Sequence, residues 1–198
     1  MTTASHPVLY EPATERLQLR QWRTDDRAPF ATMSADEQVM RYFPAPLNRS
    51  QSDAMADKCE ALLAARGWGL WAVERKADRR FIGFVGLHVP QDPLPFMPCV
   101  EIGWRLARHA WHQGFASEAA RAALQLGFEQ LQLPEIVAFT TVSNLPSQAL
   151  MQRLGMLRDR AGDFDHPALP GDHPLKAHVL YRISAASFAQ NTGKTASV

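Results

Sequence analysis

A short strand pattern that passes through a glycine turn into a long helix pattern is the most constraining feature of this sequence. The β-type run covers residues 100–106, the turn contains Gly114, and an alanine- and leucine-rich helical pattern runs from about Ser117 to Leu131. Such a junction leaves backbone N–H groups unpaired at the start of the helix, where the positive end of the helix dipole also lies. This arrangement binds anions, most often a phosphate. The sequence therefore predicts a phosphate site at this turn.

Apolar patterns divide the rest of the chain into short strands and helices. Period-two patterns predict strands over residues 17–22, 69–74, 81–89, 100–106, 135–141, 156–164 and 178–184. Helical patterns with cap and stop residues predict helices over about 24–33, 36–42, 50–66, 117–131 and 145–154. The second and third strands are separated by a charged turn, which predicts a hairpin. In a chain of 198 residues, this order of elements predicts one mixed α/β domain.

Composition limits the class of partner. The chain is 46% hydrophobic and 21% charged, with a formal net charge of +1, so its bulk electrostatics favour neither nucleic acid nor an anionic membrane. The stretch from Met1 to Arg20 has no apolar signal region, and no apolar run approaches the length that spans a bilayer. We therefore expect a cytoplasmic protein that binds neither nucleic acid nor a membrane. Cys59 and Cys99 are far apart in sequence and are expected to be reduced thiols.

Three kinds of phosphate site compete for the Gly114 turn. A Rossmann turn has several glycines in an early βαβ unit, with an acidic residue about 20 positions later, whereas this turn has one glycine and lies past the middle of the chain. A P-loop ends in Gly-Lys-Thr or Gly-Lys-Ser. The Gly-Lys-Thr at residues 193–195 has Phe188 in place of the first glycine of that motif. Neither pattern fits.

The third kind is an acyl-coenzyme A site, and here the residues match a known family. The segments that match are Glu15–Arg20, Phe81–Gly83, Glu101–Trp104, Gln113–Ala119 and the stretch from Asn144 to Met156. In their order and spacing these five segments resemble the GNAT superfamily of N-acetyltransferases across roughly residues 14–184. In particular, the chain resembles the branch that includes the ribosomal-protein N-terminal acetyltransferases.

The resemblance implies an α/β (α+β) fold: a single mixed, mostly antiparallel sheet of about seven strands, with a central splayed parallel pair and helices on both faces. The parallel pair would be the strands at 101–106 and 135–141. The chain would divide into an N-terminal extension (1–13), the acetyltransferase domain (14–184) and a flexible C-terminal tail (185–198). The implied ligand is acetyl-CoA, used as a co-substrate, with no metal.

The same resemblance implies which residues hold acetyl-CoA. Its pantetheine arm would lie between the two splayed strands and bond to backbone N–H groups at Trp104 and Leu106, which would also polarise the thioester carbonyl. Asn144 would orient the arm. The pyrophosphate would bind at the turn formed by Gln113, Gly114, Phe115, Ala116 and Ser117. The turn departs from the family pattern in two places, because Trp111 stands where Gln or Arg is usual and His112 where a second Gly is common.

Acetyl transfer to an amine needs a base for the proton of the amine and an acid for the leaving thiolate. Much of the superfamily uses a tyrosine as the acid, but that position here is Met151, which has no proton to give. The ribosomal-protein branch has a serine near the helix start. Ser147 is therefore the candidate acid, and capping of the helix is its alternative role. Glu101 is the leading candidate base. His88, at the end of the preceding strand, is expected near it as a substrate-binding residue, and a histidine imidazole on the acceptor side is the alternative base.

Three further residues are candidates for the acceptor side of the site. His166 and His173 lie in a histidine- and proline-rich loop that is expected to overhang the acceptor, and Phe43 is expected in the pocket wall by its position alone. Each histidine has the alternative role of a surface or loop-packing residue. The gaps between His166, His173 and His178 do not match a compact zinc motif, and no cysteine joins them, so no metal site is expected.

Two functions of different classes follow from this site. The first is an enzyme that moves an acetyl group from acetyl-CoA to a primary amine, either a protein N-terminus or a small molecule, by direct attack. The second is a non-catalytic acyl-CoA-binding or sensor module. The missing tyrosine and the altered turn at residues 111–112 favour this alternative. We expect a monomer or homodimer whose partners are acetyl-CoA and an amine acceptor.

Overall fold

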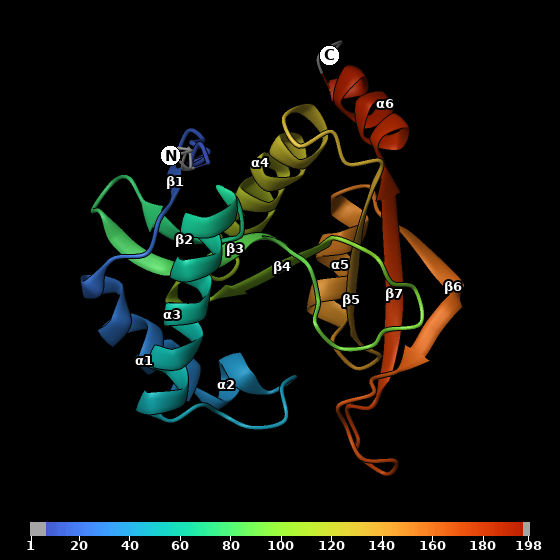
Figure 1. The fold of residues 1–198 in the computed structure, drawn as a ribbon, viewed down its shortest axis with the longest axis horizontal. Coiled ribbons are helices and arrows are strands. Elements are labelled where there is room, and N and C mark those ends of the chain that lie inside the picture. The colour runs from blue at the N-terminus through green and yellow to red at the C-terminus, as the bar shows by residue number, and fades with distance from the viewer. Residues whose placement is uncertain (1–6, 196–198) are drawn as a thin grey trace, which may run out of the picture.

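A seven-stranded open sheet organises the molecule (Figure 1). The computed structural model describes residues 7–195, so residues 1–6 of the expected N-terminal extension and 196–198 of the expected tail lie outside the described part of the chain. The strands follow the order β1-β2-β3-β4-β5-β7-β6 across the sheet. Neighbouring strands are antiparallel except for β4 and β5, which are parallel. The predicted mixed, mostly antiparallel sheet is confirmed.

From β1 to β7 the element order agrees with the order predicted from the sequence patterns. The strands are β1 (Leu17–Arg20), β2 (Leu70–Arg75), β3 (Arg80–His88), β4 (Glu101–Leu106), β5 (Glu135–Thr141), β6 (Leu157–Asp165) and β7 (Ala177–Ser184). The helices are α1 (Arg27–Ala35), α2 (Glu37–Met40), α3 (Arg49–Arg66), α4 (Phe115–Glu129), α5 (Leu145–Arg153) and α6 (Ala185–Thr195). Short 3-10 turns occupy Thr24–Asp26 and Arg108–Ala110. β2 and β3 form the predicted hairpin.

The parallel pair is joined at one end only. β4 and β5 share a single register position, Glu101 opposite Val137, and the Val137 N–H donates to the carbonyl of Val100 at 2.9 Å. Beyond this point the two strands diverge, as Figure 1 shows for β4 and β5. The expected splayed pair is therefore present at the centre of the sheet.

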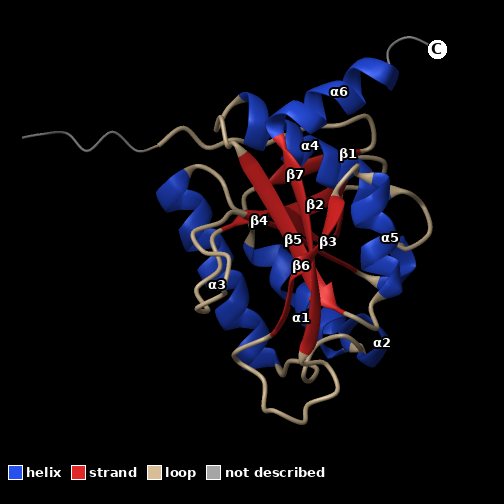
Figure 2. Ribbon diagram, turned by 90° about the vertical axis from the view of Figure 1, so that its right-hand side faces the viewer, coloured by secondary structure: helices blue, strands red, loops and turns tan. Residues whose placement is uncertain are grey.

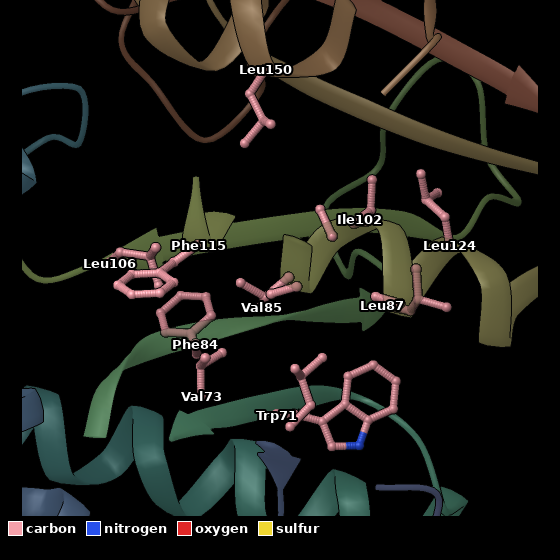
Figure 3. Packing of buried hydrophobic residues seen from close by; sticks show 14 of the residues in the cluster. Trp71, Val73, Phe84, Val85, Leu87, Ile102, Leu106, Phe115, Leu124 and Leu150 are labelled. Atoms are coloured by element: carbon pink, nitrogen blue, oxygen red, sulfur yellow. The ribbon is translucent and has the colours of Figure 1, made fainter. Parts of the chain in front are cut away.

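Helices cover both faces of the sheet (Figure 2). α1 and α3 contact β3 and β2 on one face, where ring centroids 4.9–6.4 Å apart join an aromatic group made of Trp22, Phe30, Phe81 and Phe84. α4 and α5 contact β3, β4 and β5 on the other face. Figure 3 shows Val85, Leu87 and Ile102 of that face grouped with Leu124 of α4. The prediction of helices on both faces is confirmed.

A buried ion network fixes β1 to the turn before α1. The Arg20 guanidinium donates to both carboxylate oxygens of Asp26, at 2.7 and 2.8 Å, and to Glu74 at 2.7 Å. The three side chains are at most 8% exposed. Charges this deeply buried are tolerated only when they are paired, so loss of one partner leaves an uncompensated ion in the core.

The expectation of a flexible tail from residue 185 is wrong for the described part, because Ala185–Thr195 forms helix α6. The Ser184 hydroxyl accepts a hydrogen bond from the Ser187 N–H at 3.2 Å and so caps the helix. Phe188 is 7% exposed, and its ring lies 5.0 Å from that of Phe128 on α4. At the other end, Tyr10 of the expected extension is bound to the domain, since its carbonyl accepts from the Trp71 indole at 2.7 Å.

Candidate functional site

The turn before α4 presents unpaired backbone donors. Gly114 is the N-cap residue of α4, with φ +80°, and no side chain caps the helix. The left-handed conformation favours glycine, and it turns the chain directly into the helix. The amides of Phe115, Ala116 and Ser117 therefore have no partner within residues 7–195. α4 begins two residues earlier than predicted, so these amides belong to its first turn and suit an anionic ligand.

Arg16 of the segment before β1 lies against this turn, which the sequence did not predict. Its guanidinium forms an ion pair with Glu118 at 2.6 Å and donates to the Gln113 carbonyl at 3.0 Å. The guanidinium carbon also lies 4.6 Å from the centroid of the Phe115 ring. Burial acts to raise the pKa of Glu118, but hydrogen bonds from Thr14 and Arg16 outweigh it and hold the pKa below its ordinary value. Arg16 thus places a cation beside the open amides.

A groove of about 660 Å³ runs along the start of α4. Its lining residues are Glu15, Arg16, Gly114, Ser117, Glu118 and Arg121. The formal charges of the two arginines and the two glutamates cancel, so the N-terminus of α4 supplies the remaining positive potential in the groove. Arg121 is a second lining residue that the sequence did not single out, because it appears there as an ordinary charge on the exposed face of a helix.

The two unusual turn positions have structural contacts. The Trp111 indole donates to the Leu106 carbonyl at 2.8 Å and so ties the turn to the end of β4. His112 is exposed and adopts φ +58°, a left-handed conformation that is uncommon for residues other than glycine. The side-chain amide of Gln113 donates to the His109 carbonyl at 2.7 Å. Trp111 and Gln113 therefore hold the turn in shape.

The edge of β4 that faces β5 is open at its C-terminal end. The Ala107 N–H donates to Ile82 on β3 at 2.9 Å, and bonding directions alternate along an antiparallel pair. The N–H groups of Trp104 and Leu106 consequently point away from β3, toward β5. Since β4 and β5 pair only at Glu101, these two donors have no partner in the described part of the chain, where the strands diverge. They are the donors that the sequence assigned to the coenzyme.

Ser147 lies across this opening from β4. Its hydroxyl accepts a hydrogen bond from the Trp104 indole at 3.3 Å. The helix cap is Asn144, whose side-chain oxygen accepts from the Ser147 N–H at 3.3 Å and whose side-chain nitrogen donates to Thr140 at 2.9 Å. Asn144 therefore holds the start of α5, and the Ser147 hydroxyl is not used as a cap. Met151 is 1% exposed and belongs to the core.

Glu101 and His88 meet on the opposite face of β4. Their side chains lie 2.9 Å apart, from His88 Nε2 to Glu101 Oε2, and are 31% and 12% exposed. Successive side chains of a strand point to opposite faces. Glu101 and Trp104 therefore flank β4 from its two sides, with the open N–H groups between them. The sequence predicted that Glu101 and His88 would be neighbours.

Comparison with known proteins identifies the family. A model of the acetyltransferase (GNAT) domain matches residues 16–157. The chain belongs to the GNAT family of acetyltransferases. It is 32% identical, over 149 residues, to the uncharacterized N-acetyltransferase YoaA of Bacillus subtilis (strain 168), and the match covers 74% of this chain and 82% of that protein.

Solved GNAT structures share the fold. The acetyltransferase (GNAT family) from Bacillus anthracis superposes with a TM-score of 0.75 at 25% identity, over 89% of this chain and 99% of that one. Spermidine N-acetyltransferase from Vibrio cholerae, solved in complex with CoA and spermine, gives a TM-score of 0.69 at 19% identity, over 89% and 99% of the two chains. The GNAT fold with its parallel β4–β5 pair is thus shown.

The acceptor candidates of this GNAT domain lie in different surroundings. The Phe43 ring is 38% exposed and covers the guanidinium of Arg105 on β4, 4.1 Å from its carbon. His166 belongs to an aromatic group with His178, Phe139 and Phe164, at centroid distances of 5.0–6.3 Å.

The last acceptor candidate, His173, is bound within its own loop. Its Nδ1 accepts from the Leu175 N–H at 3.1 Å, which matches the loop-packing alternative. Within residues 7–195 no group of three or more His, Cys, Asp or Glu residues is placed to hold a metal ion. No helix in that range is long and apolar enough to cross a bilayer.

Proposed function

We propose that this GNAT acetyltransferase moves an acetyl group from acetyl-CoA to a primary amine by direct attack. One observation carries the proposal: two sets of free backbone donors lie at the two places where a coenzyme needs them. The amides at the start of α4 suit the pyrophosphate. The Trp104 and Leu106 N–H groups on the open edge of β4 suit the pantetheine arm and the thioester carbonyl.

Side chains on the two faces of β4 carry out the two proton transfers. On one face, Glu101 with its partner His88 takes a proton from the attacking amine. The new C–N bond forms as the C–S bond of the thioester breaks. On the other face, the Ser147 hydroxyl gives a proton to the leaving thiolate. Because the amine and the thiolate lie on opposite sides of the carbonyl carbon, this arrangement keeps the acid and the base apart.

The proposed acceptor is a primary amine of one of two classes, a protein N-terminus or a small molecule. The resemblance to the ribosomal-protein branch favours a protein N-terminus, whereas spermidine N-acetyltransferase from Vibrio cholerae, which shares the fold, is named for a small polyamine. In this proposal the loops around Phe43 and residues 166–176 border the acceptor. We expect the reaction to take place in the cytoplasm.

The proposal is tested by release of free coenzyme A thiol from acetyl-CoA with a panel of amines and N-terminal peptides. Ser147→Ala should lower kcat by about 100-fold or more, the lower end of general-acid contributions, and leave the KM for acetyl-CoA nearly unchanged. Ser143→Ala is the matched control, since Ser143 is exposed in the turn before α5. An unchanged kcat in Ser147→Ala would remove the assigned role.

A second variant tests the base. Glu101→Gln keeps the size of the side chain but removes its ability to accept a proton at neutral pH. It should lower kcat, and the parent enzyme's loss of rate on the acid side should disappear from its pH profile. If the coenzyme binds tightly and no amine or peptide of a broad panel is acetylated, the chain is the acyl-CoA-binding module instead.

A further inference from the structure

Arg105 of β4 is a buried cation without a carboxylate. The residue is 8% exposed, and within residues 7–195 no Asp or Glu oxygen lies within 4.0 Å of its nitrogens. Its Nε is buried and has no hydrogen-bond partner. One terminal nitrogen contacts the thioether sulfur of Met55 at 4.0 Å, a weak acceptor. The Nε–H donor of the guanidinium is therefore unused, and one terminal nitrogen has only a weak acceptor.

Aromatic rings make up the surroundings of Arg105. Its guanidinium carbon lies 4.1 Å from the Phe43 ring centroid and 5.3 Å from that of Phe84. Burial lowers the pKa of Arg105 to about 10, so the group remains a cation at neutral pH. Ring contacts restore only part of the solvation that a buried guanidinium loses, because they leave its N–H donors unsatisfied. A carboxylate or another oxyanion would satisfy these donors through charge-assisted hydrogen bonds.

Arg105 shares a face of β4 with the proposed base. Glu101, Gly103 and Arg105 alternate along the strand, so the Glu101 and Arg105 α-carbons lie about 13 Å apart along β4. Gly103 leaves the middle of this stretch open. An added Cβ there would have His88 Nε2 and Leu70 Cδ2 as its nearest neighbours, both at 3.9 Å. The face therefore offers a base at one end, an uncovered strand in the middle and a cation at the other end.

We propose that Arg105 binds a carboxylate of the acceptor, so that the substrate is an amine that also carries a carboxylate several bonds from the reacting nitrogen. The planar guanidinium matches a carboxylate through two parallel hydrogen bonds. Phe43, in the loop between α2 and α3, covers the cation, so a bound carboxylate has to displace this 38% exposed ring. This inference rests on the proposed function, because it assigns the acceptor of that same site.

The proposal is tested with a series of ω-amino acids of increasing chain length, from glycine to 6-aminohexanoate. Each acid is compared with its primary amide as an acetyl acceptor. At the best chain length, the acid should have a kcat/KM at least tenfold higher than its amide. Arg105→Met should bring this ratio close to 1 by raising the KM for the acid, and Arg105→Lys should retain part of the preference. The matched control is Arg41→Met, which removes an exposed arginine stacked on Tyr42 at 4.7 Å and should leave the ratio unchanged.

Thermal unfolding separates this role from a structural one. If Arg105 serves the ligand, Arg105→Met removes an unsatisfied buried charge and should keep or raise Tm. A lowered Tm together with an unchanged acid-to-amide ratio would show that Arg105 only supports packing and would overturn the proposal.

A binding measurement tests the carboxylate site independently of acetyl transfer. The Nε–H signal of Arg105 in a ¹⁵N NMR spectrum, assigned by its loss in Arg105→Lys, should shift with the acids and not with their amides. If the acids shift this signal but no amine is acetylated, the carboxylate site stands and the proposed function fails. If amides are acetylated as fast as acids and no acid shifts the signal, the proposed function stands and the carboxylate site is wrong.

Discussion

Gly83 of β3 controls the spacing of the strands at the open end of β4. It lies opposite Leu106 and adopts φ +141°, a conformation that side chains rarely allow. A Cβ built on Gly83 would lie 2.2 Å from the Arg105 carbonyl oxygen and 2.7 Å from the Leu106 α-carbon. Because non-bonded atoms settle near 3.5 Å, Gly83→Ala must separate β3 and β4 by about 1 Å.

The destabilisation has two parts. The unfavourable backbone conformation costs about 1–3 kcal/mol, and overpacking costs about 1–3 kcal/mol more, so the free energy of unfolding should fall by about 2–6 kcal/mol. For a chain of this size each kcal/mol lowers Tm by about 2–4 °C, so Tm should fall by about 4 °C or more. Thermal unfolding followed by circular dichroism measures this change.

Gly171→Ala is the control for Gly83→Ala. Apart from its two chain neighbours, no residue between 7 and 195 has a heavy atom within 4 Å of a Cβ built on Gly171, so the free energy of unfolding of Gly171→Ala should change by less than about 0.5 kcal/mol. The strand shift also displaces the Leu106 N–H, and a displacement of about 1 Å at such a donor should lower kcat/KM by about 100-fold. Equal Tm values for the two variants would refute the strand-spacing argument.

Two substitutions and one labelling experiment test the burial of other side chains. Arg20→Met leaves the buried Asp26 carboxylate without its cation, while Glu74 keeps its ion pair with Arg23 at 2.9 Å, and it should cost about 3–5 kcal/mol in urea unfolding. Arg49→Met, at an exposed i,i+4 pair, should cost less than about 1 kcal/mol. Phe188→Ala should cost about 3 kcal/mol, because the ring is 7% exposed; no change in stability would mean that α6 does not pack as described. Burial raises the pKa of the Cys59 and Cys99 thiols to about 11. Their alkylation by iodoacetamide, followed by mass spectrometry, should therefore be slow at neutral pH, and its rate should rise about tenfold per pH unit up to the pKa. Rapid labelling at pH 7 would contradict this.

Most of the fold was predictable because its signals are local. β5 has the predicted bounds, since a β-branched run is bounded by Pro134 and a polar turn. The start of α4 was predicted two residues late, because the cap of the helix is a glycine in a left-handed conformation and no side chain marks it. α6 was missed because its small, polar composition is typical of a frayed tail. The burial of Phe188 decides its structure, and that contact is long-range.

The site was predictable where neighbours come from adjacent strands. Glu101 and His88 were expected together because His88 ends the strand that precedes Glu101, and the structure pairs the two residues between β3 and β4. The contact between Arg16 and Glu118 joins residues 102 positions apart, so no local pattern indicates it. Arg105 lies in a strand whose side chains alternate between two faces, and a charged residue in such a pattern predicts a solvent-exposed side chain. Its burial depends on α3 and on the Phe43 loop, which the strand pattern does not contain.

A crystal structure with bound coenzyme A tests the central claim most directly. The account predicts pyrophosphate oxygens within hydrogen-bond distance of the amides of Phe115, Ala116 and Ser117. It also predicts a pantetheine arm bonded to the N–H groups of Trp104 and Leu106, with its sulfur beside Ser147. Coenzyme bound elsewhere, with these amides unpaired or bonded only to water, would contradict it.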